Sequence, residues 1–109
     1  RTTTGASVMD RDHPSAIGPV VIDNAAASRF EVLIDGEVVG FAEYVERGDV
    51  VELPHTVVDR SVRGRGVAAI LVERSLASIR ASGRSVLPTC WYVAQFMDGH
   101  PDWSDLRAG

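Results

Sequence analysis

The sequence predicts a mixed α+β domain, in which an antiparallel β-meander precedes a β-α-β unit and a short C-terminal helix. Two observations support this fold class. Apolar residues alternate with polar ones in strand-like segments over residues 29–58, with short glycine turns between the segments. Helical spacing replaces the alternation over residues 65–81, and a further apolar segment follows. A helix that crosses between two strands implies that the last two strands are parallel.

The meander is predicted from its turns as much as from its strands. Asp35-Gly36 is a pair that favours a type I′ hairpin, and a second turn is expected at residues 47–49. A short apolar run before the meander indicates one more strand. The expected strands are 20–22, 29–34, 37–46 and 50–58.

Pro54 falls inside the last strand of the meander. Proline lacks the N–H that a ladder needs, so it is confined to edges and bulges. One interpretation is a bulge that splays the strand pair and leaves the next backbone groups free for a ligand. The other is that Pro54 lies on an outward-facing edge.

The helix over 65–81 carries an apolar stripe that includes Val72, Leu76 and Ile79, and Gly83 is expected to end it. A short buried strand should follow at 86–87. The remaining elements are expected to be a second helix over 91–97 and a packed irregular segment over 100–106.

Length and composition limit the organisation and the partners. The 109 residues suit one domain, expected over 17–109, after a flexible polar arm at 1–16 in which His13 is solvated. The net charge of −4 argues against nucleic-acid or anionic-membrane partners. No apolar run is long enough to span a membrane, and no metal site is expected. The single Cys90 excludes an internal disulfide and fits a reducing, cytoplasmic compartment.

The segment 57–68 has the composition of an anion-binding turn. An apolar strand leads into a basic turn with Gly64 and Gly66, and a helix follows at once. Free N–H groups at a helix start, together with the helix dipole, bind phosphate, and Arg63 and Arg65 add charge. The spacing is neither that of a Walker loop nor Gly-x-Gly-x-x-Gly. It reads Arg-x-x-Gly-x-Ala, ending at Ala68; the simpler alternative is a basic turn that caps a helix.

This signature resembles the pyrophosphate motif of the GNAT acetyltransferase superfamily, and the order of elements over about 29–106 is similar to the GNAT core. The long N-terminal helices of most members are missing. The chain looks like the minimal subgroup, whose short motifs recur here. They are His55, Thr56 and Val58 before the turn; Pro88 and Cys90 after the last strand; and His100, Pro101 and Trp103 near the end.

The resemblance implies an N-acetyltransferase that uses acetyl-CoA as co-substrate and an unidentified amine (small molecule, peptide or protein) as acceptor, in a monomer or weak dimer. The pyrophosphate would rest on the backbone of the turn. The pantetheine arm would pair with the strand, and a backbone N–H near Thr56 or Val57 would polarise the thioester. The expected CoA-binding residues are Thr56, Val57, Val58, Arg63, Gly64, Arg65, Gly66, Val67 and Ala68.

Candidate catalytic residues are fewer and less sharply defined. His55 could act as a base, because imidazole titrates near neutral pH, or it could be a satisfied core histidine. Glu43 and Glu52 are alternative bases, although solvated strand faces suit them better. Many superfamily members use a tyrosine acid on the last helix; Tyr92 is the nearest tyrosine here, one turn earlier.

Cys90 follows a strand end and precedes a helix, where the helix dipole favours a thiolate. It could accept the acetyl group and pass it on, or it could be a small buried hydrophobe. The aromatic residues Trp91, Phe96 and Trp103 are expected to be core anchors. Two other functions stay open: an acyl-CoA sensor without catalysis, and an interaction module that binds no cofactor.

Overall fold

The computed structural model describes residues 18–108 and confirms the predicted α+β fold. One five-stranded sheet has its strands in chain order, and the first four are antiparallel. The last pair is parallel. The predicted arm, with His13, lies outside the described residues. The strands are β1 (Val20–Asn24), β2 (Arg29–Ile34), β3 (Glu37–Arg47), β4 (Val50–Val58) and β5 (Ser85–Leu87).

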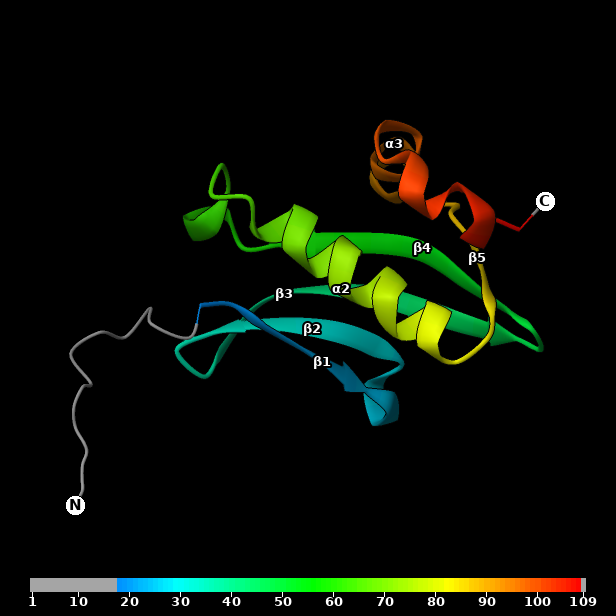
Figure 1. The fold of residues 1–109 in the computed structure, drawn as a ribbon. Helices are drawn as coiled ribbons and strands as arrows, with labels where there is room; N and C mark the ends of the chain where they lie inside the picture. The colour runs from blue at the N-terminus through cyan, green and yellow to red at the C-terminus, as the bar shows by residue number, and fades with distance from the viewer. Residues whose placement is uncertain (1–17, 109) are drawn as a thin grey trace, which may run out of the picture.

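Helix α2 (Val67–Ala81) lies across one face of the sheet, and α3 (Trp91–Gly99) stands beyond β4, next to β5 (Figure 1). The buried stripe of α2 packs on the sheet to form one core. Removal of these apolar side chains from water is the main force that holds the helix on the sheet. The largest fully buried side chains are Leu53, Leu71, Leu76, Ile79, Val32, Val51, Val72, Val86 and Val93.

Local conformations explain where the elements begin and end. Asp35 and Gly36 have φ values of 52° and 82°, which is the signature of the expected type I′ turn. Helix α2 begins two residues later than expected, because Gly66 has a left-handed φ of 75° that a helix cannot contain. The segment expected to be irregular is instead a 3₁₀ helix over Pro101–Leu106. After it, the N–H of Ala108 donates to the carbonyl of Val86 at 2.7 Å, so the chain packs against β5.

Strand β4 contains a bulge at Pro54. Glu43 pairs with His55 and Val45 with Glu52, so two residues of β4 lie opposite one residue of β3. The bulge interpretation of the sequence is therefore correct, and the missing proline N–H removes no regular ladder bond. Pro54 also lies beyond Glu52, the last residue of β4 that pairs with β5, so its side away from β3 is an edge that β5 does not cover.

Beyond the bulge, β4 has a free edge. Its pairing with β5 ends at Glu52, although β4 continues to Val58. The N–H of Asp59 donates to the carbonyl of Val39 on β3 at 2.7 Å. In an antiparallel pair every second residue hydrogen-bonds to the partner strand, so this bond fixes which residues of β4 face β3 with their backbone groups. Thr56 and Val58 must then turn their backbone N–H and C=O groups away from β3, toward the open side. This opening agrees with the splay that one of the two interpretations of Pro54 suggested.

Gly40 allows β3 to approach this part of β4 closely. A Cβ atom on Gly40 would lie 2.9 Å from the carbonyl oxygen of Val57 and 3.2 Å from side-chain carbons of Val32 and Val58. The first contact is with backbone, which cannot rotate away. A side chain at this position would therefore push β4 out of register with its neighbour.

We expect Gly40→Ala to lower the free energy of unfolding by about 1–3 kcal/mol, the usual range for overpacking. Gly99→Ala is the control, because a Cβ there meets no atom within 4 Å and Gly99 has no positive φ. Urea denaturation of both variants measures the difference. Equal stability of the two variants would contradict the close packing of β3 on β4.

Candidate active site

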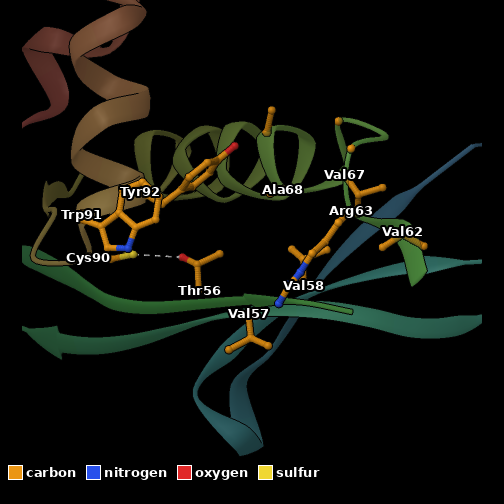
Figure 2. Close-up of a pocket in the computed structure, with 13 residues that line it drawn as sticks. Thr56, Val57, Val58, Val62, Arg63, Val67, Ala68, Cys90, Trp91 and Tyr92 are labelled. Carbon is orange, nitrogen blue, oxygen red and sulfur yellow. Dashed lines mark hydrogen bonds between the residues drawn. The ribbon is translucent and has the colours of Figure 1, made fainter. Parts of the chain in front are cut away.

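A pocket of about 620 Å³ opens where β4 has its free edge. Its other walls are the glycine turn and the first turns of α2 and α3 (Figure 2). A pocket of this size is in the range of small-molecule sites. It is lined by Thr56, Val57, Val58, Val62, Arg63, Gly64, Gly66, Val67, Ala68, Ala69, Cys90, Trp91 and Tyr92.

One end of the pocket is a helix start without a capping side chain. Gly66 occupies the N-cap position of α2 and offers no side chain to the first turn. Among the described residues, the backbone N–H groups of Val67, Ala68 and Ala69 have no hydrogen-bond partner. Three free donors at the positive end of a helix dipole form a site for an anion.

The glycine turn shapes this end. Gly64 and Gly66 have φ values of 81° and 75°, which glycine adopts without strain. No atom lies within 4 Å of a Cβ placed on either glycine, so the space beside the backbone is open. Arg63 lines the pocket and supplies a positive charge, whereas Arg65 belongs to the same turn but not to the lining.

Cys90 stands at the opposite end, at the junction of β5 and α3. Its N–H donates to the carbonyl of Leu53 at 2.9 Å, and its side chain is 8% exposed. Its Sγ donates to Oγ1 of Thr56 at 3.6 Å, as Figure 2 shows. A thiol from the start of α3 and a hydroxyl from β4 thus meet at one end of the pocket.

His55 lies on the other face of the sheet. Thr56 faces Cys90, and adjacent strand residues point to opposite faces. The imidazole of His55 is exposed and packs edge-on against Phe41, with ring centroids 6.4 Å apart. The core-histidine alternative is therefore wrong, and His55 forms no dyad with Cys90.

The two alternative carboxylate bases also lie away from the lining. Glu43 is exposed and pairs with His55 across the ladder. Glu52 accepts from the Thr89 hydroxyl at 2.7 Å and from Arg47 at 3.0 Å. These two hydrogen bonds lower the pKa of Glu52, and the one from Thr89 has the larger effect. A carboxylate with a lowered pKa is a weak base.

The aromatic residues of the C-terminal part divide into two groups. Phe96 is buried, as predicted, and Trp103 is partly buried against the core with Arg80 4.5 Å above its ring. The expectation that Trp91 is a core anchor is wrong, because 74% of it is exposed. It lies in the first turn of α3 and packs edge-on against Tyr92, with ring centroids 5.7 Å apart.

Tyr92, which the sequence indicated only as the tyrosine nearest to the usual position of the acid, is part of the pocket lining. Its side chain extends over the pocket toward α2 (Figure 2), and burial raises the pKa of its phenol. A phenol with a raised pKa keeps its proton and can donate it. The position of Tyr92, two residues after Cys90 at a helix start, was a signal that both side chains could reach one pocket. Val62 and Ala69 also line the pocket without having been expected there.

Residues 18–108 bring together no group of three metal-ligating side chains. No helix in that range has both the length and the apolar character needed to cross a bilayer.

Comparison with known structures shows that the fold is similar to that of solved N-acetyltransferases. The ribosomal-protein-S18-alanine N-acetyltransferase from Escherichia coli superposes with a TM-score of 0.57 at 16% identity, over 65% of this chain and 49% of that chain. AAC(6')-Iy, in complex with the bisubstrate analogue CoA-S-monomethyl-acetylneamine, gives a TM-score of 0.51 at 21% identity, over 74% and 64%. The chain thus spans about half to two thirds of these structures.

Sequence comparison gives the family itself. The profile described as GCN5-related N-acetyl-transferase matches residues 29–106. Protein NATD1 from Mus musculus is 32% identical over 95 residues, which are 81% of this chain and 86% of the relative. The chain belongs to the GCN5-related N-acetyltransferase family.

Proposed function

We propose that this protein is an acetyl-CoA-dependent N-acetyltransferase that acetylates an amine. The observation that carries the proposal is a single pocket that joins an anion-binding helix start to a thiol and a hydroxyl, along a free strand edge. Coenzyme A has the matching parts in the matching order: a pyrophosphate, an amide-bearing arm and a thioester. The structural neighbour solved with a CoA-based bisubstrate analogue supports this use of the fold.

The pyrophosphate would bind at the glycine turn. The free N–H groups of Val67, Ala68 and Ala69 would donate to its oxygens, and Arg63 would pair with its charge. Gly64 and Gly66 let the backbone come close because no side chain fills the space beside them. Arg65, outside the lining, would act at longer range.

The pantetheine arm would run along the free edge of β4. The amides of that arm need backbone partners, and Val58 turns its N–H and C=O toward the open side. Thr56 does the same one step closer to Cys90, so its N–H would polarise the thioester carbonyl. The N–H of Val57 faces β3, so Val57 would contribute packing rather than this hydrogen bond.

The chemistry would take place beside Cys90. In direct transfer, the neutral amine attacks the thioester carbon, the C–S bond breaks, and the CoA thiolate leaves and takes up a proton. In the two-step route, the Cys90 thiolate attacks first and releases CoA; the amine then attacks the acetyl-cysteine and releases the thiolate. Tyr92, protonated and above the pocket, can supply the proton to the leaving sulfur. His55 lies on the other face of the sheet and outside the pocket lining, so the proton that the amine loses would pass to water at the open side of the pocket rather than to the imidazole.

We expect Gly66→Ala to weaken CoA binding roughly ten- to a hundredfold, because the new methyl group keeps phosphate from charge-assisted donors of the turn. Gly83→Ala is the matched control. Gly83 lies just past the other end of α2 with a φ of 81° and equally open surroundings. Both variants should lose about 1–2 kcal/mol of stability from the positive φ. Calorimetry with CoA separates them; equal affinities would show that the pyrophosphate does not bind at this turn.

We expect Arg63→Ala to weaken CoA binding and to reduce its dependence on salt, because Arg63 would act on phosphate through its charge. Arg74→Ala removes the same charge from an exposed position further along α2 and should leave both quantities unchanged. Calorimetric titrations at low and high ionic strength provide the measurement. If the salt dependence of Arg63→Ala equals that of the parent protein, the contact is absent.

We expect bound CoA to slow alkylation of Cys90, since the thiol would lie beside the CoA sulfur. Mass spectrometry after mixing with acetyl-CoA then separates the routes: an acetyl adduct on Cys90, with turnover lost in Cys90→Ala, indicates the two-step route. Full turnover in Cys90→Ala indicates direct transfer. Equal alkylation rates with and without CoA would refute the placement of the thioester. Binding of CoA without consumption of acetyl-CoA, across an amine panel, would identify a sensor rather than an enzyme.

A further inference from the structure

Trp91 has an environment that packing does not explain. Its side chain is 74% exposed, although tryptophan is the largest apolar side chain in the chain. It nevertheless borders the pocket, next to Cys90 (Figure 2). An exposed tryptophan at the mouth of a site is a typical ligand-contact residue, because its rigid ring offers a large contact area at low entropic cost.

The position of Trp91 along the pocket assigns it to the acceptor side. The glycine turn with Arg63 forms one end, and the Cys90 end holds Trp91 and Tyr92. If CoA binds as proposed above, its acetyl group reaches Cys90. The acceptor must then approach at this end, where Trp91 is the exposed surface.

The charges at this end restrict the chemistry of the acceptor. No Asp or Glu is among the described residues that line the pocket, and Arg63 is the only charged residue among them. Glu52, which is tied to this end through Thr89, is already paired with Arg47. A polyamine needs several carboxylates to replace its hydration, and the pocket lining offers none.

We infer that Trp91 binds the acceptor, and that the acceptor is a small primary amine on an apolar or aromatic carbon skeleton. The inference rests on the function proposed above. The indole ring packs against the carbon skeleton, and its face attracts the amine while that is still an ammonium ion. Tyr92 packs edge-on against the indole and so fixes the orientation of the ring that would contact the acceptor. The Cys90 thiol and the Thr56 hydroxyl line the same pocket as Trp91, and the acetyl group would lie beside them.

The binding test uses the fluorescence of Trp91 in the Trp103→Phe variant, which leaves Trp91 as the only tryptophan. With CoA present, 2-phenylethylamine should change this fluorescence in a saturable way, and spermidine should not. No saturable change with 2-phenylethylamine, in protein that binds CoA, would overturn the inference. So would a stronger response to spermidine or to a short peptide with a free amino terminus.

The kinetic test compares Trp91→Ala, Trp91→Phe and the parent protein. Trp91→Ala should raise the KM for 2-phenylethylamine about three- to thirtyfold, the range that ring–cation contacts provide, and Trp91→Phe should recover most of it. The Kd for CoA should stay the same in all three. An unchanged KM in Trp91→Ala would refute the role of Trp91. Failure of the proposed function is a different result, because the parent protein would then either not bind CoA or bind it without consuming acetyl-CoA with any amine of the panel.

Discussion

The bulge at Pro54 is the constraint on which the site depends. Side chains alternate along a strand, so without the extra residue the buried face that carries Leu53 would next carry His55. The bulge shifts the alternation by one residue. Thr56 and Val58 therefore face the pocket, and His55 lies on the other side of the sheet (Figure 2 shows the first two). The pocket, its hydroxyl and the separation of two candidate catalytic side chains all follow from this one irregularity.

The sequence was sufficient for the order of elements, because each strand and each turn has a local signal. The Asp35-Gly36 pair predicted a positive φ at both positions, and both residues have positive φ in the structure. Pro54 predicted either a bulge or a strand edge, but the neighbouring residues did not indicate which of the two. The answer depended on the pairing of β4 with both of its neighbours: the register against β3 has the bulge, and the pairing with β5 ends before Pro54, at Glu52. The face to which His55 belongs depends on the bulge.

The exposure of Trp91 could not be predicted for a related reason. An aromatic residue at a helix start is buried or exposed according to what covers that end of the helix. The chain places Tyr92 over the pocket and leaves most of the Trp91 side chain exposed at the border of the pocket. The conformation of the glycine turn was easier to predict, because glycine spacing indicates both the positive φ values and a helix start without a capping side chain. The net charge of −4 also made the positive charge of this turn a local feature.

The parallel pairing of β4 with β5 has a consequence for the order of folding. The hairpins of the meander close over turns of two residues, whereas Val50 must find Ser85 across the whole of α2. Closing the long loop between β4 and β5 loses more chain entropy than closing a two-residue turn, and this loss comes before the stabilising contacts form. We therefore hypothesise that this pairing forms last. Cys90 then reaches Thr56 only at the end of folding, and a partly folded chain has its meander but no pocket. Pulse-labelled hydrogen exchange would refute this order if the β5 amides became protected before those of β2 and β3.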